Sequence, residues 1–278
     1  MTQTTRRGWA LPSYYFALLA LLYLPILVLL VFAFNDSPIL VFPLRGFTLQ
    51  WFRELFATEA LMRSLRNSVF VAAGSSVIAT ALATAGAIAF VRFEFRGKGL
   101  FMSVALLPLY VPFVVLGVAL LLWLSALGVP RSLLTIAAAH TVVGFPYALL
   151  ILVARLVGFD RHLEEAAMNL GANYWQTLRR VVLPLIAPAI FAAWLTAFTV
   201  SFDEFAIANM VVGREPTLPV YLYSQFRMTS RLPRVIAMAA LIMAITLTAF
   251  FVLVWLRRYV FRGDREVQTI GPTPAGQG

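Results

Sequence analysis

The chain has 278 residues, of which 61% are apolar and only 12% are charged. A water-soluble core could not cover that much apolar surface, so the composition argues against a soluble enzyme and against a disordered chain. Cys is absent, which excludes disulfides and thiolate zinc sites, and His140 and His162 lie too far apart to predict a metal site. The formal charge of +10 comes almost wholly from Arg residues between long apolar runs, a pattern typical of a membrane protein rather than of a nucleic-acid-binding protein.

Six apolar runs are long enough to cross a bilayer as helices, which takes about 20 residues each. They predict an all-α, polytopic membrane protein with both termini on one side. The excess of Arg and Lys makes that side cytoplasmic, by a modest margin. The six spans are approximately Pro12–Phe34, Ser68–Val91, Leu100–Leu127, Leu133–Val157, Leu185–Val212 and Val235–Leu256.

These spans are expected to form one membrane domain over residues 12–256. Residues 1–11 form a cytoplasmic N-terminus, with the first span uncleaved, and residues 257–278 a cytoplasmic tail. The end of the tail is rich in Gly and Pro, which predicts disorder.

Between the first two spans, Thr48–Arg66 carries an apolar stripe beside charged residues. The stripe is typical of a helix on the outer membrane surface, although an ordered loop is an equal alternative. In the second span, small residues recur at every fourth position and predict a face packed against protein; they are Ser75, Ala79, Ala83 and Ala87. Pro112 and Pro146 allow bends in the third and fourth spans.

The loop after the fourth span contains strong helix start and stop signals. Asp160 can cap a short helix of about ten residues, and Gly171 suits the position just beyond its end. Asn173 and Gln176 have the spacing of a second N-cap with its box partner, and Pro184 is placed as a first-turn proline of the fifth span. The loop therefore predicts a short cytoplasmic helix joined tightly to a span.

Side chains on this short helix are suited to contact with a soluble partner. Ala166 and Ala167 allow close approach, while Glu164 and Glu165 offer carboxylates to Arg residues of another chain. Such an element could transmit a push from that partner into the membrane. The alternative is a plain interfacial helix.

The same loop resembles the EAA motif of the permeases of ATP-binding-cassette (ABC) importers. That motif runs Glu-Ala-Ala, three residues, Gly, nine residues, Ile, one residue, Leu-Pro, and Val181 replaces the Ile here. The matching residues are Glu165, Ala166, Ala167, Gly171, Val181, Leu183 and Pro184. In that family this short helix is called the coupling helix and docks on the ATP-binding subunit, so we call residues 158–184 the coupling loop.

The resemblance extends over most of the chain and points to the spermidine/putrescine branch of the family, and within it to the more C-terminal permease of the pair. It rests on Phe47–Phe52, Asn67-Ser68, Arg92–Lys98, Pro112, His140, Pro146, Gly158–Asp160 and Ser201–Glu204. The branch also contains permeases for opines and other small solutes.

The resemblance implies the type I importer permease fold in a bacterial inner membrane. It implies a second permease subunit, a dimer of ATP-binding subunits and a periplasmic or extracellular solute-binding protein as partners. The chain itself shows no P-loop around Gly97-Lys98, no serine nucleophile elbow and no zinc pair. We therefore expect no catalytic or metal site and no bound cofactor in this chain, with ATP and Mg used by the partner ATPase.

The fifth span contains a pair of carboxylates, Asp203 and Glu204, with Ser201 and Asn209 nearby. Ionisable groups at membrane depth face a cavity or a partner, because lipid cannot hydrate them. One hypothesis is that the pair lines the translocation path and attracts a cationic solute, and a similar acidic pair occurs in the polyamine permeases that this chain resembles. The other is a structural pair that meets a neighbouring helix or lies at the water interface.

One departure from the polyamine pattern concerns the segment before the sixth span, which in that branch often runs Pro-Glu-x-Asn-Ala. Arg234 and Ile236 replace the Glu and the Asn here. A basic residue there disfavours a polycation, unless it serves to contact the binding protein. The solute could therefore be an opine, an amino-acid derivative or another small polar molecule. Two other classes find less support in the sequence: a secondary transporter would show two repeated halves, and a membrane enzyme would show a catalytic set, and we find neither.

Overall fold

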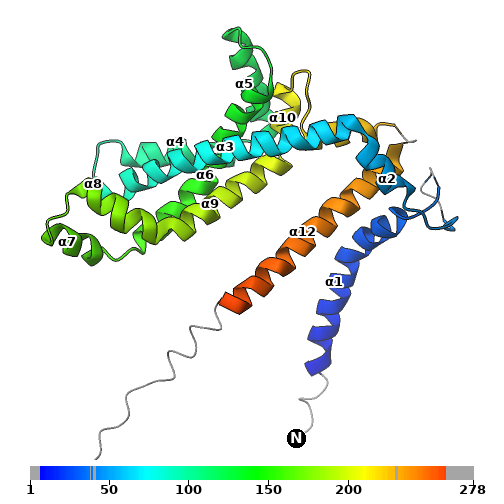
Figure 1. Cartoon of the computed structure of the whole chain (residues 1–278), viewed down its shortest axis with the longest axis horizontal. Coiled ribbons are helices and arrows are strands. Elements are labelled where there is room, and N and C mark those ends of the chain that lie inside the picture. The colour runs from blue at the N-terminus through cyan, green and yellow to red at the C-terminus, as the bar shows by residue number, and fades with distance from the viewer. Residues whose placement is uncertain (1–6, 38, 40–41, 229–230, 261–278) are drawn as a thin grey trace, which may run out of the picture. The chain divides into compact units, whose positions relative to one another are not determined.

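The computed structural model describes residues 7–37, 39, 42–228 and 231–260. Within them the chain is helical, and its β-structure is a single bridge between Asn35 and Phe47. The helices are α1 (Arg7–Phe32), α2 (Gln50–Ala57), α3 (Glu59–Arg92), α4 (Lys98–Tyr110), α5 (Phe113–Ala126), α6 (Leu133–Val157), α7 (His162–Asn169), α8 (Tyr174–Thr177), the π-helix η1 (Leu178–Val182), α9 (Leu183–Asp203), α10 (Ala206–Val211), α11 (Leu218–Phe226) and α12 (Leu232–Val260) (Figure 1).

Each of the six predicted spans corresponds to helical structure. Four single helices are long and apolar enough to cross a membrane, and the bent pair α4–α5 makes a fifth span. The sixth predicted span falls on α12, where the apolar segment Leu232–Ile245 is shorter than these spans. The chain is thus an all-α polytopic membrane protein.

Packing divides the chain into two units. We call residues 58–224 the core bundle and residues 1–57 with 225–278 the flanking unit. The prediction of one membrane domain over residues 12–256 stays a prediction.

The core bundle is built on α3, α6 and α9, which pack against one another. The small-residue face predicted for the second span is confirmed, because Ser75, Ala79, Ala83 and Ala87 are all buried. At Gly144 a Cβ atom would lie 3.4 Å from the Cβ atoms of both Ala79 and Ala197. Small side chains therefore let three helices meet closely at one level of the bundle.

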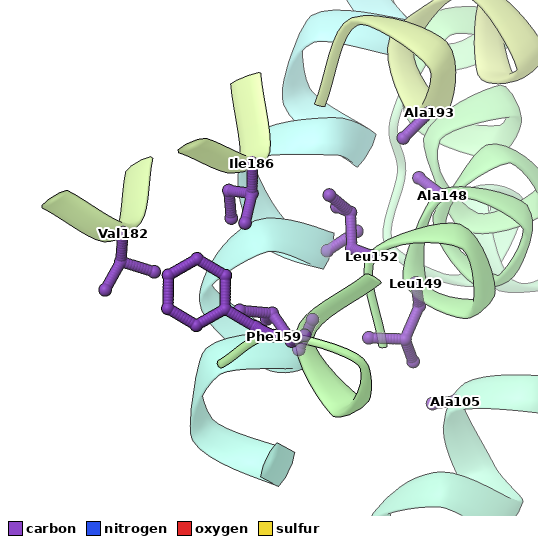
Figure 2. Close-up of a cluster of buried hydrophobic side chains, with 11 residues drawn as sticks. Ala105, Ala148, Leu149, Leu152, Phe159, Val182, Ile186 and Ala193 are labelled. Carbon is purple, nitrogen blue, oxygen red and sulfur yellow. The ribbon is translucent and has the colours of Figure 1, made fainter. Parts of the chain in front are cut away.

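A second apolar cluster ties the coupling loop to this bundle. Figure 2 shows Phe159 and Val182, which come from the two ends of the loop, in one apolar cluster with Leu152 of α6 and Ile186 of α9. Burial of these side chains removes apolar surface at the end of the bundle from water. The cluster fixes both ends of the coupling loop to the core bundle.

The two proline predictions have different outcomes. α4 and α5 meet at 108° around Pro112, because a proline has no N–H to continue the helix and holds the preceding Val111 in an extended conformation. α6 instead runs through Pro146 as one helix from Leu133 to Val157. Pro112 therefore bends the third span, whereas Pro146 leaves the fourth span continuous.

The fifth span differs from the prediction at both ends. Its helix begins at Tyr174 rather than near Leu185, since α8, η1 and α9 are contiguous, and it stops at Asp203. The predicted single run Leu185–Val212 is wrong at this end, because the chain breaks at Glu204 and restarts as α10. The cause of the break lies in the side chain of Glu204, as described below.

In the flanking unit, α2 packs against α12, and α12 also contacts α1. The helix predicted within Thr48–Arg66 is present as α2, but its apolar stripe is partly used inside the protein. Trp51 and Leu55 are buried, and Trp51 Nε1 donates a hydrogen bond of 2.8 Å to the backbone oxygen of Asn35. Residues from Glu59 onward belong to α3 instead.

Candidate functional site: the coupling loop and a buried polar cluster

The cap signals of the coupling loop are used in the structure, although Arg161 and not Asp160 directly precedes α7. The Asp160 carboxylate accepts a hydrogen bond of 3.0 Å from the backbone N–H of His162, the first residue of α7. At the other end Gly171 has φ +92°, and its N–H and that of Ala172 donate to the carbonyls of Met168 and Ala167. This pair of bonds is a Schellman motif, which ends α7 sharply.

The second cap signal is also confirmed. Asn173 Oδ1 accepts from the N–H of Gln176 at 2.8 Å, and Gln176 Oε1 accepts from the N–H of Asn173 at 3.0 Å. The helix that starts there passes through η1 before reaching Pro184 in the first turn of α9. Pro184 has no N–H for an α-helical bond, and the wider π turn before it absorbs that loss.

An ion pair holds α7 against α3. The guanidinium of Arg92 at the end of α3 binds the carboxylate of Glu164, and both side chains are nearly buried, at 8% and 12% exposure. Arg92 also lies over the ring of Phe159, 5.5 Å from its centroid, and Arg161 donates to the backbone oxygen of Val91 at 3.2 Å. The orientation of α7 is therefore set by contacts within the chain.

This pairing changes the role expected of Glu164. Its carboxylate was predicted to meet an Arg of a partner, but Arg92 of the same chain occupies it. Glu165 is different, since its side chain is 61% exposed and lies 3.4 Å from Nδ1 of His162, which is also exposed. Of the two carboxylates, Glu165 is the one that a partner can reach.

The outer surface of the coupling loop is apolar and open. α7 has no buried residue, and Leu170 beside Gly171 is 90% exposed. Ala166 is exposed, while Ala167 is half-buried. Further exposed apolar side chains surround them: Leu163, Met168, Tyr174 and Trp175. Val181 and Leu183 are half-buried in the adjoining helix, and Pro184 is exposed.

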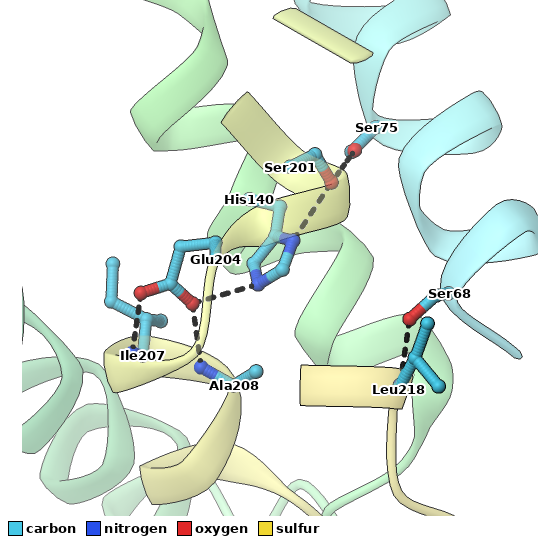
Figure 3. Close-up of polar contacts among 8 residues, drawn as sticks. All are labelled: Ser68, Ser75, His140, Ser201, Glu204, Ile207, Ala208 and Leu218. Carbon is cyan, nitrogen blue, oxygen red and sulfur yellow. Dashed lines mark hydrogen bonds and ion pairs between the residues drawn. The ribbon is translucent and has the colours of Figure 1, made fainter. Parts of the chain in front are cut away.

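A buried polar cluster joins α3, α6 and the end of α9 (Figure 3). Ser201 Oγ is 2.9 Å from Ser75 Oγ and 2.8 Å from His140 Nδ1. The other ring nitrogen of His140, Nε2, lies 3.2 Å from Glu204 Oε2, although this approach is not aligned for a hydrogen bond. Each of the three helices thus contributes a polar side chain to one buried chain of contacts.

Glu204 also explains why the fifth span breaks. Its Oε1 accepts the N–H of Ile207 at 2.8 Å, and its Oε2 accepts the N–H of Ala208 at 2.9 Å. These N–H groups are in the first turn of α10 and have no partner within that helix. The carboxylate therefore caps α10, which supports the structural alternative for this residue.

The predicted carboxylate pair is separated by the structure. Glu204 is buried in the core bundle, whereas Asp203 is exposed at the last residue of α9. Asn209 is half-buried in α10, and Ser201 is buried within the cluster. Of the four predicted path residues, Asp203 is the one whose charged group is open to a solute.

Sequence reasoning missed several members of these contacts. The sequence presents His140 only as a possible metal ligand and as part of the family resemblance, and Ser75 only as a small residue. Two more polar contacts bind α3 to the segment around α11: Ser68 Oγ accepts from the Leu218 N–H at 2.7 Å, and Asn67 Nδ2 donates to the Pro216 oxygen at 3.1 Å. Asn67, Ser68, His140 and Arg92 were all within the resemblance, which was the available signal.

Comparison with known proteins defines the class. The family model described as "binding-protein-dependent transport system inner membrane component" matches residues 78–262. The chain belongs to this family, and it is a permease subunit of an ABC importer in the inner membrane.

Individual relatives carry the resemblance further. The putrescine transport system permease protein PotI of Escherichia coli strain K12 is 37% identical over 256 residues, which are 89% of this chain and 90% of that protein. The spermidine/putrescine transport system permease protein PotC of Haemophilus influenzae is 31% identical over 84% of this chain and 91% of that one.

Among solved structures, a chain of a bacterial ABC transporter that imports the acidic polysaccharide alginate has a TM-score of 0.68. The two chains are 16% identical, and the part that matches is 90% of this chain and 98% of the transporter chain, so the two share the fold.

Proposed function

We propose that this chain forms half of the translocation pathway of a bacterial importer for polyamines such as putrescine and spermidine. The observation that carries the proposal is its 37% identity to a putrescine permease over nearly the whole of both chains. The exposed carboxylate of Asp203 at the end of α9 adds support, because it would attract a cationic solute.

The partners follow from the same proposal. A second permease completes the pathway, a dimer of ATP-binding subunits docks on the cytoplasmic side, and a solute-binding protein docks outside. ATP and Mg are used by the ATP-binding subunits, and this chain acts without making or breaking a bond. Both of its termini are cytoplasmic.

Coupling to ATP hydrolysis is proposed to run through α7. Its exposed apolar surface around Leu170 contacts the ATP-binding subunit, with Glu165 at the contact. Arg92 and Glu164 hold α7 on α3, and the contiguous helix α8–η1–α9 leads from the loop into the bundle. Movement of the ATP-binding subunits would therefore be passed to α3 and α9 together.

A second candidate solute class is a small polar molecule that is not a polyamine, favoured by Arg234 and Ile236. Within the flanking unit, Arg234 Nε lies 2.6 Å from Glu54 Oε2, so its charge is offset by a carboxylate. The argument against a polycation is weaker for that reason.

The test is uptake by the whole importer in proteoliposomes. We expect labelled putrescine or spermidine to enter only with ATP inside, with the binding protein present and without dependence on an ion gradient. Uptake of opines with no uptake of either polyamine would favour the second solute class. Uptake that persists without ATP would contradict coupling.

A further inference from the structure

Four aromatic side chains form a continuous ridge along α9. They are spaced three and four residues apart, which places them on one side of the helix. Consecutive ring centroids lie 5.6 Å, 5.8 Å and 6.0 Å apart, distances typical of interacting rings. The members of this aromatic ridge are Phe191, Trp194, Phe198 and Phe202.

The rings of the aromatic ridge are at least partly exposed on the surface of the core bundle. α9 buries Ala193, Ala197 and Ser201, whereas Phe191 is 61% exposed and the other three rings are half-buried. A groove of about 390 Å³ between α3 and α9 is lined by Phe191 and Trp194 together with α3 residues. The rings are therefore not fully buried by packing inside the bundle.

A carboxylate stands at the end of this ridge. Asp203 follows Phe202 directly and is exposed, as is Thr199 one turn earlier. A carboxylate on a membrane helix faces water or a partner, because lipid offers it no hydrogen bonds. No Lys or Arg occurs between Leu183 and Asp203, so a cation moving along α9 meets no like charge on it.

We propose that the aromatic ridge is the surface along which a polyamine moves through the permease after Asp203 has attracted it. Ring faces attract ammonium groups, and the methylene segments of a polyamine pack on the same apolar surface. Several equivalent weak contacts in series let a cation advance without being held at one point, as conduction requires. The inference rests on the proposed polyamine function and names the surface that serves it.

The first test compares uptake of labelled putrescine by whole importers carrying ridge variants. Trp194→Leu and Phe198→Leu keep an apolar side chain but remove the ring, and each is expected to lower the maximal uptake rate about two- to tenfold. Phe198→Tyr keeps the ring and is expected to stay within about twofold of wild type. If the Leu variants took up putrescine at the wild-type rate, the role proposed for the aromatic ridge would be wrong and the proposed function would stand. If the wild-type importer took up no polyamine, the proposed function and this inference would both be wrong.

The second test uses the absence of Cys from the chain, which makes an introduced thiol unique in it. In the assembled importer, Phe198→Cys should react with a cationic methanethiosulfonate reagent, and putrescine should slow the labelling. Leu107→Cys on α4, at an exposed apolar site away from the ridge, should stay unlabelled. A thiol at position 198 that does not react, or that reacts equally fast with putrescine, would show that the ridge faces lipid or a partner helix.

Discussion

At the residue scale, several polar side chains inside the core bundle bind partners on other elements. Glu204 is the clearest case, since it is 5% exposed, contacts His140 and accepts two backbone hydrogen bonds. A buried carboxylate without such partners would be strongly unfavourable. Glu204 thus holds α10 onto the bundle, and Asp203 is left as the more exposed carboxylate of the pair.

Replacing Glu204 should therefore destabilise the protein rather than remove a solute contact. We expect Glu204→Ala to lower the free energy of unfolding by about 3 kcal/mol, because each hydrogen bond to a charged group contributes about 1.5–3 kcal/mol. Glu204→Gln, which retains one acceptor, should lose less. Thermal unfolding of the purified importer measures the change, with Asp203→Asn as the exposed control that stays at the wild-type midpoint. Unchanged stability of Glu204→Ala would refute the capping role.

The backbone conformation at position 171 explains why a glycine occupies it. Its φ of +92° costs a side-chain-bearing residue about 1–2 kcal/mol, although no atom lies within 4 Å of the position of a Cβ. We expect Gly171→Ala to loosen the end of α7 and to reduce uptake severalfold. Gly99→Ala in α4, which also has open space and a negative φ, is the matched control and should transport normally. Equal uptake by both variants would exclude a conformational role.

At the element scale, the coupling loop is attached to the bundle at both ends and through α7. Phe159 and Val182 anchor its ends in the apolar cluster, and the pair Arg92–Glu164 fixes α7 between them. Buried pairs of this kind are costly to break, because the remaining partner is left as an uncompensated charge. If α7 couples transport to ATP hydrolysis as proposed, we expect this pair to be needed for that coupling.

Breaking that pair should uncouple transport from ATP hydrolysis. We expect Glu164→Ala and Arg92→Ala each to reduce uptake at least tenfold while basal ATP hydrolysis continues, since a loss of about 3 kcal/mol is expected for one broken buried pair. The exchange Arg92→Glu with Glu164→Arg should restore part of the coupling. Glu94→Ala removes an exposed pair with Lys98 and serves as the control with normal uptake.

The exposed side chain of Leu170 offers a separate test of docking. Leu170→Ala should weaken copurification of the ATP-binding subunit without changing the unfolding midpoint, because a 90% exposed side chain contributes little to the isolated chain. Leu134→Ala, at an exposed position of α6, should leave copurification intact. A retained ATP-binding subunit in the Leu170 variant would place the docking surface elsewhere.

At the scale of the whole molecule, the arrangement of spans sets which loops face the ATP-binding subunits. The six-span prediction with cytoplasmic termini places α7 inside and the turn around Val129 outside. In a chain without native Cys, a thiol introduced by Val129→Cys should be labelled by a membrane-impermeant reagent in intact cells. Leu170→Cys should be labelled only after permeabilisation. The reverse pattern would invert the topology and remove the basis for coupling at α7.

Much of this molecule was predictable because its signals are local. Apolar length marked the spans, four-residue spacing of small residues marked the packed face of α3, and Asn173, Gln176 and Gly171 marked the caps of the coupling loop. The end of the fifth span was mispredicted, since apolar residues continue past Glu204 and Glu is not a preferred N-cap. Nothing in the local pattern separates Glu204 from Asp203.

The sequence by itself determined that this chain crosses a membrane and where the Asn173 and Gly171 caps of the coupling loop lie. Through the motif in that loop, it also determined the family to which the chain belongs. Only the tertiary structure decided which polar groups meet: Arg92 with Glu164, 72 residues apart, and His140 with Ser201, 61 residues apart. Cap and span signals depend on neighbours along the chain, whereas the pairing of buried charges depends on which helices pack together. That packing decided that Glu164 and Glu204 hold the structure and that Glu165 and Asp203 remain open.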